Sequence, residues 1–295
     1  MKFLVYGVNG WIGGKVYKLL QEKGADVVAG NCRVNDIKKL EEEIKEVKPT
    51  HVISLIGRTH GTYNDKVYGT IDYLEQPGKL VENVRDNLFS PMVLGLLSKK
   101  HDFHFTYLGT GCIFEFDKEH PFGEEVNGFD ENSLPNFFGS SYSIVKGFTD
   151  QLMHLMEDSV LNVRIRMPIT DEFNNRNFIT KITNYEKICS VPNSMSVLNE
   201  LLPIMIDMAK KKLTGTINLT NPGLITHNEI LEMYKEIVDP DFKWENFTID
   251  QQRKILDSGR SNNFLSTERL STLYPQVKKI KDSVREILVK MKGNL

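Results

Sequence analysis

The chain has 295 residues, of which 40% are hydrophobic and 26% charged, a composition typical of a globular protein with a substantial buried core. The formal net charge is -2 and no basic cluster exceeds a few residues, which argues against a nucleic-acid partner. No stretch approaches the length and apolarity of a membrane span, so we also expect no membrane partner.

The chain contains three cysteines that lie far apart. Cys32, Cys112 and Cys189 are odd in number and fit neither a disulfide framework nor a zinc site. We therefore expect reduced thiols, no metal ion and a cytoplasmic location. The N-terminal residues also lack the charged start and long apolar stretch of a signal peptide, which favours the same location.

Predicted strands alternate with predicted helices through the first half of the chain. In chain order, the strands are expected at 2–6, 26–29, 51–56, 103–108 and 161–166. The helices between them are expected at 14–23, 36–47, 80–100 and 142–158. The strand at 51–56 is almost continuously apolar, as in a strand buried on both faces of a parallel sheet. Repeated strand–helix units predict an α/β fold with a Rossmann-type, doubly wound parallel sheet.

The character of the chain changes at Pro168, where the elements become shorter and less regular. We therefore predict a Rossmann domain at 1–167, a fold that commonly binds dinucleotides such as NADP. A smaller, mainly substrate-binding α/β domain is expected at 168–295. One segment, at about 214–222, is expected to return a strand to the main sheet.

Three glycines follow the first predicted strand with the spacing G-x-x-G-x-x-G. Glycine allows a tight turn and a close backbone approach, and the following helix N-terminus offers amide donors to a pyrophosphate. A glycine turn that binds nothing is the alternative, but the position in the first strand–helix unit favours a dinucleotide. The expected cofactor contacts in this turn are Gly7, Asn9, Gly10, Trp11, Ile12 and Gly13.

Arg33 follows the second predicted strand. NAD-specific folds usually place an acidic residue there, whereas this chain has no Asp or Glu until Asp36. A guanidinium suits a 2′-phosphate, so we expect NADPH as the cofactor rather than NADH. The alternative is that Arg33 is a solvated loop charge.

Tyr142 and Lys146 match the pattern Y-x-x-x-K near the start of a predicted helix. This spacing places both side chains on one helical face, where an ammonium lowers the pKa of a phenol and helps it deliver a proton. A second match at 274–278 contains Pro275 and is disfavoured for that reason. Thr110, at the end of the preceding strand, is the expected hydroxyl partner of Tyr142.

Cys112 lies two residues after Thr110. A small packing residue at a strand end is one interpretation. The other is a catalytic base beside the carbonyl that Tyr142 polarises, because a nearby positive charge converts a thiol into a competent base. Its closeness to Thr110 favours the second interpretation.

These motifs resemble the extended short-chain dehydrogenase/reductases that modify nucleotide sugars. The stretch 108–113 is similar to that of the GDP-fucose synthase family, which uses this cysteine in epimerisation. Nearly the whole chain resembles the plant-type bifunctional UDP-4-keto-6-deoxyglucose 3,5-epimerase/4-reductases, which make UDP-rhamnose. The similar stretches are 10–14, 110–115, 135–137, 164–168, 176–182, 192–195, 221–223, 227–234 and 260–263.

The resemblance implies a reaction and further site residues. Epimerisation at C3 and C5 would precede an NADPH-dependent reduction at C4 that gives UDP-L-rhamnose, and a separate 4,6-dehydratase would supply the substrate. The resemblance implies that Lys181 works with Cys112 as an acid/base pair, although the residue alone would be read as a solvent-facing lysine. Asn177, Arg260 and Asn262 are implied contacts to the sugar nucleotide.

Alternatives and one departure accompany this resemblance. The stretch 57–61 replaces a more apolar, Ala-rich segment near the cofactor. A 4-reductase alone, acting on UDP- or dTDP-linked sugars with a structural Cys112, stays open. A non-catalytic regulatory subunit is disfavoured because Tyr142 and Lys146 are both present. The resemblance also implies a homodimer that pairs the helices at 80–100 and 142–158.

Overall fold

The computed structural model describes residues 1–294, which fall into two compact units. Unit 1 consists of Met1–Thr110, Ser140–Arg164 and Leu202–Ile217. Unit 2 consists of Gly111–Gly139, Ile165–Leu201 and the chain from Asn218 onward.

The two units differ in two segments from the domains predicted at 1–167 and 168–295. Residues 111–139 group with unit 2, because Phe114 and Phe129 form a buried cluster with Leu265. Residues 202–217 group with unit 1, because they lead into the last strand of the main sheet. The sequence analysis expected one segment, at about 214–222, to return to the main sheet, whereas the segment in unit 1 is 202–217.

The main sheet has six strands in the order β10-β7-β6-β3-β1-β2. They are β1 (Lys2–Tyr6), β2 (Asp26–Ala29), β3 (His51–Ser54), β6 (His104–Thr110), β7 (Val160–Ile165) and β10 (Gly215–Asn218). β1 pairs in parallel with both β2 and β3, and β3 pairs in parallel with β6. The predicted Rossmann-type parallel sheet is confirmed, and β10 joins it from the second half of the chain.

Smaller strands pair outside the main sheet. β4 (Gly61–Tyr63) and β5 (Lys66–Tyr68) form an antiparallel hairpin in unit 1. β8 (Pro168–Ile169) and β9 (Ser196–Val197) pair in parallel in unit 2.

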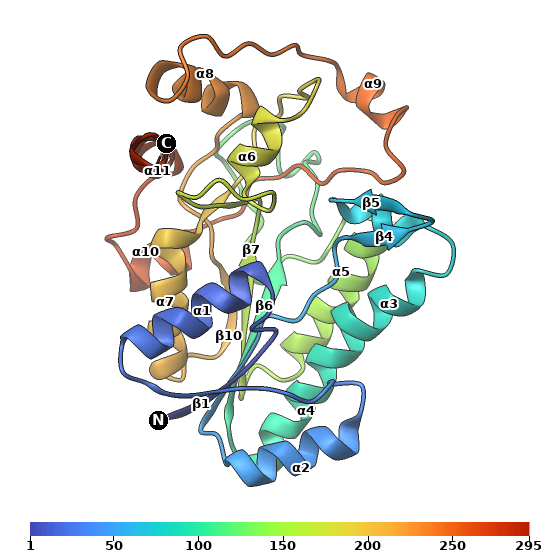
Figure 1. Cartoon of the computed structure of the whole chain (residues 1–295), viewed down its shortest axis with the longest axis vertical. Helices are drawn as coiled ribbons and strands as arrows, with labels where there is room; N and C mark the ends of the chain where they lie inside the picture. Colours follow the sequence, from blue (N-terminus) through green and yellow to red (C-terminus); the bar gives the residue numbers. More distant parts are fainter. Residues whose placement is uncertain (295) are drawn as a thin grey trace. The chain divides into compact units, whose positions relative to one another are not determined.

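Helices cover both sides of the main sheet, with α1 on one side and α4 and α5 on the other (Figure 1). The helices of the first half are α1 (Trp11–Glu22), α2 (Ile37–Val47), the 3-10 turn η1 (Ile71–Glu75), α3 (Leu80–Val84), the π turn η2 (Arg85–Phe89), α4 (Ser90–His101) and α5 (Ser141–His154). Those of the second half are α6 (Phe178–Thr183), α7 (Leu198–Lys210), α8 (His227–Ile237), α9 (Ile249–Arg253), α10 (Glu268–Leu273) and α11 (Ile280–Gly293).

The helix predicted at 80–100 is present but contains the π turn η2 between α3 and α4. Pro91 has no backbone N–H, so the Asn87 carbonyl loses its ordinary helical donor. The Thr149 hydroxyl on α5 donates to that carbonyl at 2.8 Å instead. The Ser90 hydroxyl donates to the Arg85 carbonyl at 2.9 Å. The π turn therefore depends on a partner distant in sequence.

The glycine-rich turn lies at the point where the strand order reverses. The chain leaves β1 toward β2 on one side of the sheet and returns to β3 on the other side of β1. In open α/β sheets, ligands bind outside the carboxyl ends of the strands at such a switch point. The carboxyl ends of β1 and β6, which carry the predicted site residues of unit 1, lie at this edge.

Two buried histidines, His51 and His104, lie side by side at the amino ends of β3 and β6. Their ring centroids are 5.8 Å apart, and His51 also stacks on Phe3. His104 Nε2 lies 2.6 Å from the Leu213 carbonyl, so this nitrogen carries the proton. His51 Nε2 and His104 Nδ1 have no hydrogen-bond partner. Burial, followed by the charge of His104, lowers the pKa of His51 to about 4.

We expect the free energy of unfolding to decrease as the pH falls from about 6.5 to about 4. In this range His51 is protonated in the unfolded chain but stays neutral in the folded protein, because its pKa is lower there. This group contributes at most about 3 kcal/mol. Free energies of unfolding measured across this range should fall less steeply for His51→Phe than for the wild type. Parallel curves for the two proteins would show that His51 does not cause the loss.

Candidate active site

The glycine-rich turn after β1 is closed tightly. Gly7 has a positive φ of 83°, and the Gly10 N–H donates to its carbonyl at 2.9 Å. A Cβ on Gly13 would lie 1.9 Å from the same oxygen, so only glycine fits. No side chain caps the start of α1, and its first turn holds no acidic residue. The turn therefore fits an anion such as a pyrophosphate. The other predicted contacts are at least partly exposed: Asn9, Trp11 and Ile12.

Arg33 is exposed in the loop between β2 and α2. The loop is anchored because the Asn31 N–H donates to Glu43 Oε1 at 2.8 Å. The Tyr6 hydroxyl donates to Glu43 Oε2 at 2.6 Å, so this carboxylate is already bonded within the protein. Arg33 is thus an exposed cation in an anchored loop, and an exposed guanidinium suits a phosphate.

Tyr142 lies in the first turn of α5, and Lys146 follows one turn later. Ser140 caps this helix by accepting from the Ser143 N–H at 3.0 Å, which fixes its start. Lys146 is only 4% exposed. Thr110 is the last residue of β6 and is also buried. The predicted reductase residues therefore occupy one helix start and one strand end within unit 1.

Tyr107 on β6 is an additional member of this group that the sequence analysis missed. The Lys146 ammonium donates to the Tyr107 hydroxyl and to the Leu108 carbonyl, the latter at 3.4 Å. It also lies 4.5 Å from the centroid of the Tyr107 ring. Burial, and then the charges of Tyr142 and Asp150, raise the pKa of Tyr107 well above 10. Tyr107 therefore stays neutral and accepts a hydrogen bond from the lysine.

Cys112 is half-buried in unit 2 and is not in a disulfide. The two residues after it, Ile113 and Phe114, are fully buried and form a cluster with Phe129 and Leu265. The Phe114 and Phe129 rings stack with centroids 4.6 Å apart. This packing anchors the chain beside Cys112, a residue that itself stays half-buried.

Lys181 lies on α6 in unit 2, where its surroundings differ from those of a solvent-facing lysine. Burial, followed by the positive charges of Arg176 and Arg260, lowers the pKa of Lys181. A lysine whose pKa is lowered in this way gives up its proton more readily near neutral pH. Arg176 is a charged neighbour that the sequence analysis did not single out.

Asn177 has a structural role that its spacing could have indicated. It is fully buried and caps α6 by accepting from the Ile179 N–H at 3.3 Å. Its amide donates to the Thr170 and Glu172 carbonyls at 2.9 and 2.8 Å. An asparagine just before a helix is a common N-cap. In this structure its side chain is bonded to the backbone around the start of the helix that carries Lys181.

Arg260 and Asn262 lie in the irregular segment before α10. Arg260 donates to the carbonyl of Ser258 at 3.0 Å and also to its hydroxyl. Asn262 Oδ1 accepts from Asn193 at 2.8 Å. Both side chains are half-buried, so they keep some access to solvent.

Comparison with known proteins gives full-length matches. The chain is 54% identical to a UDP-rhamnose synthase of Acanthamoeba polyphaga mimivirus, whose crystal structure matches with a TM-score of 0.94 over 98% of this chain and 99% of that one. It is 43% identical over 283 residues to a bifunctional dTDP-4-dehydrorhamnose 3,5-epimerase/reductase of Arabidopsis thaliana, covering 96% of this chain and 90% of the relative. The chain belongs to this epimerase/reductase family. No protein-family model matches it.

A longer member of the epimerase/reductase family combines these activities with a third. A trifunctional UDP-glucose 4,6-dehydratase/3,5-epimerase/4-keto-rhamnose reductase of Arabidopsis thaliana is 44% identical over 285 residues. The match covers 96% of this chain but only 41% of that relative. The chain therefore corresponds to part of the trifunctional protein.

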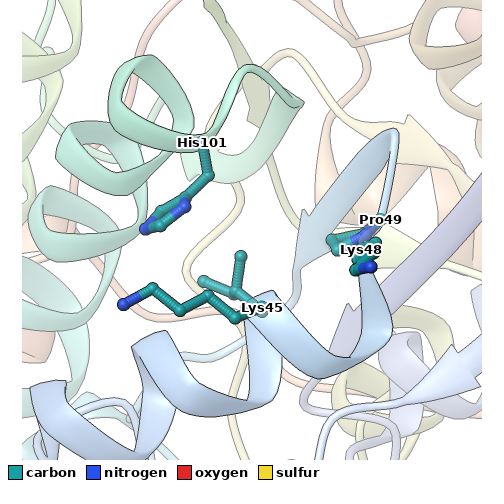
Figure 2. Close-up of a pocket in the computed structure, with 5 residues that line it drawn as sticks. Lys45, Lys48, Pro49 and His101 are labelled. Carbon is teal, nitrogen blue, oxygen red and sulfur yellow. The ribbon is translucent and has the colours of Figure 1, made fainter.

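A surface hollow of about 380 Å³ lies away from the predicted site residues (Figure 2). Ile44, Lys45, Lys48, Pro49 and His101 line it. Figure 2 shows His101 at the end of α4 and Lys45 on α2, just before the amino ends of β6 and β3. His101 and Lys45 both bond to Glu41, at 3.0 and 3.1 Å. The hollow thus lies at the edge of the sheet opposite to the glycine turn.

Among residues 1–294, no group of three or more His, Cys, Asp or Glu side chains is arranged to hold a metal ion. Within the same residues, no helix is both long and apolar enough to cross a membrane.

Proposed function

We propose that this protein converts UDP-4-keto-6-deoxyglucose into UDP-L-rhamnose by 3,5-epimerisation followed by NADPH-dependent 4-reduction. The observation that carries the proposal is the 54% identity, over almost the full length of both chains, to a UDP-rhamnose synthase. The same match favours UDP over dTDP. The 4-keto substrate would come from a 4,6-dehydratase on a separate polypeptide. We place the reaction in the cytoplasm, where the proposed thiol stays reduced.

Cofactor binding is assigned to unit 1 in this proposal, and most of the substrate binding to unit 2. The glycine turn would hold the pyrophosphate, Arg33 the 2′-phosphate and Lys146 the nicotinamide ribose. When bound, NADPH supplies the hydride that reduces C4. The chain's own contribution is a proton and a preorganised site. Tyr142 gives its proton to the C4 oxygen, and the Thr110 hydroxyl hydrogen-bonds that oxygen.

The epimerisation is assigned to Cys112 and Lys181. The C4 ketone acidifies the hydrogens at C3 and C5, so one group can remove each proton and the other can return a proton on the opposite face. The lowered pKa of Lys181 supports this exchange, because an ordinary lysine holds its proton too tightly near neutral pH. Reduction removes the ketone that acidifies both positions. Epimerisation must therefore come first.

NADPH binding should depend on Arg33, because its guanidinium is the proposed partner of the 2′-phosphate. We expect Arg33→Ala to weaken NADPH binding by roughly tenfold to a hundredfold, as loss of a charged hydrogen bond would. NADH lacks this phosphate and serves as the matched control, so its affinity should stay unchanged. Binding measured by the fluorescence of each reduced cofactor tests this. Equal weakening for both cofactors would contradict the assignment.

Substitutions should separate the two reactions when UDP-4-keto-6-deoxyglucose and NADPH are supplied and products are identified by NMR. We expect Cys112→Ala and Lys181→Met each to lower UDP-L-rhamnose formation by about a hundredfold or more. Tyr142→Phe should block reduction and leave ketosugar in solution. Lys187→Met, at an exposed lysine, is the matched control and should keep full activity. Full activity of Cys112→Ala would contradict the assignment of this cysteine to the epimerisation.

We also propose a homodimer formed through α3 and α5. These helices pack together within unit 1. They expose large apolar side chains: Val81 is 72% exposed on α3, and Phe148 is 61% exposed on α5. Such residues are usual at the centre of an interface between subunits and costly in water.

Sedimentation or light scattering measures the mass of the particle directly. We expect two chains for the wild type and one chain for the double variant Val81→Glu/Phe148→Glu, because the charges would be buried without partners. Val289→Glu, at a residue that is 58% exposed on α11, is the control and should stay dimeric. A monomeric wild type would exclude this interface.

A further inference from the structure

Arg166, the residue directly after β7, is a buried cation bonded only to neutral groups. It is 1% exposed in unit 2. Nη1 donates to the Gly111 carbonyl and the Ser261 hydroxyl, both at 3.0 Å. Nη2 donates to Asn193 Oδ1 at 2.6 Å and to the Ser261 carbonyl at 3.0 Å. Nε has no partner. Within residues 1–294, no carboxylate neutralises this guanidinium.

The contrast with Arg164, two residues earlier, shows how unusual this arrangement is. Arg164 is also fully buried, but it forms a bidentate ion pair with Asp150 at 2.9 and 2.7 Å. Burying a charge is costly unless an opposite charge compensates for it. A buried arginine without a carboxylate therefore requires another explanation than fold stability.

The network of Arg166 encloses the backbone on both sides of Cys112. The Gly111 carbonyl, which precedes Cys112, accepts from Arg166 and also from Asn263 at 2.9 Å. The Phe114 carbonyl, two residues after Cys112, accepts from Asn263 at 2.9 Å and from Ser261 at 2.6 Å. One set of buried donors thus fixes the turn that carries the thiol.

The aliphatic part of Arg166 packs directly on this turn. A Cβ on Gly111 would lie 3.0 Å from Arg166 Cγ and 2.6 Å from Leu265 Cδ1, so the absence of a side chain lets the arginine approach. Burial lowers the pKa of Arg166, and its electrostatic interaction with the Cys112 thiolate acts in the opposite direction. Cys112 is therefore the titratable neighbour whose charge acts on Arg166.

We propose that Arg166 is a positioning residue for Cys112, which holds the Gly111–Phe114 turn and supplies the positive charge that stabilises the thiolate. This inference rests on the proposed role of Cys112 in epimerisation and deepens it. A purely mechanical role for Arg166 would also reduce turnover when the residue is replaced. The test therefore needs a measurement of the thiol itself.

The pH dependence of Cys112 alkylation by iodoacetamide provides that measurement, because the thiolate is the reactive form. Mass spectrometry of the Cys112 peptide separates it from Cys32 and Cys189. In Arg166→Met, we expect the midpoint of the profile to rise by about one pH unit, which is roughly tenfold slower alkylation at neutral pH. Arg166→Lys keeps the charge and should retain most of the wild-type profile. Identical profiles for wild type and Arg166→Met would overturn the proposal.

Two further measurements keep the test decisive. Ser261→Ala removes a hydrogen-bonding partner of Arg166 but no charge, so the midpoint of the alkylation profile should stay unchanged. A shift equal to that of Arg166→Met would instead favour a purely mechanical role for Arg166. If Arg166→Met does not fold, the wild-type thiolate absorbance, taken against Cys112→Ser, gives the midpoint directly. A value below the ordinary thiol range of about 8.5 supports the proposal, and a value at or above it overturns it.

Failure of the proposal about Arg166 and failure of the proposed function give different results. If Arg166→Met shifts the alkylation profile while Cys112→Ala still forms UDP-L-rhamnose, the link between arginine and thiol holds and the catalytic role of Cys112 fails. If Cys112→Ala is inactive and the Arg166→Met profile is unchanged, only the inference about Arg166 fails.

Discussion

The end of β6 is the physical constraint on which the proposed site depends. Thr110 closes the strand in unit 1, and Cys112 follows it in unit 2. Covalent geometry keeps the Cα atoms of residues two apart within about 7 Å. The backbone thus limits the distance between Thr110, whose hydroxyl is proposed for the reduction, and Cys112, whose thiol is proposed for the epimerisation. The proposed sequence of two reactions on a single ketone relies on this short stretch of backbone.

Buried cations in this protein have different kinds of partner. Arg164 is paired with Asp150, whose pKa its guanidinium helps to lower to about 2 against the effect of burial. Lys146 is held by the neutral Tyr107 hydroxyl. Burial lowers the pKa of Lys181. The carboxylate of Asp150 compensates for the burial of Arg164, whereas a buried lysine with a lowered pKa is typical of a functional site.

Much of the fold could be predicted from local patterns. The strand at 26–29 has the expected bounds, and β10 lies within the segment expected at about 214–222. Features that depend on distant partners were not predictable. The π turn requires the Thr149 hydroxyl, and the place of residues 111–139 in unit 2 requires Leu265. No periodicity reveals such contacts.

At the site, too, residues in local motifs could be predicted, whereas residues identified by distant contacts could not. Motif spacing singled out Tyr142, Lys146 and Cys112, whose assigned roles stay proposals. Tyr107 was missed because an apolar strand gives no sign that one of its rings meets a lysine on the next helix. Arg166 was missed because its neutral partners, Asn193 and Ser261, lie 27 and 95 residues away. Only the folded chain identifies it as a charge beside the thiol turn.

Deuterium exchange in the absence of NADPH tests the central claim most directly, because the account makes epimerisation independent of the reduction. The wild-type protein, incubated with UDP-4-keto-6-deoxyglucose in D2O without cofactor, should introduce deuterium at both C3 and C5. Mass spectrometry and NMR of the recovered sugar nucleotide measure this exchange. A wild-type protein that leaves both positions protonated would contradict the account, whatever its activity as a reductase.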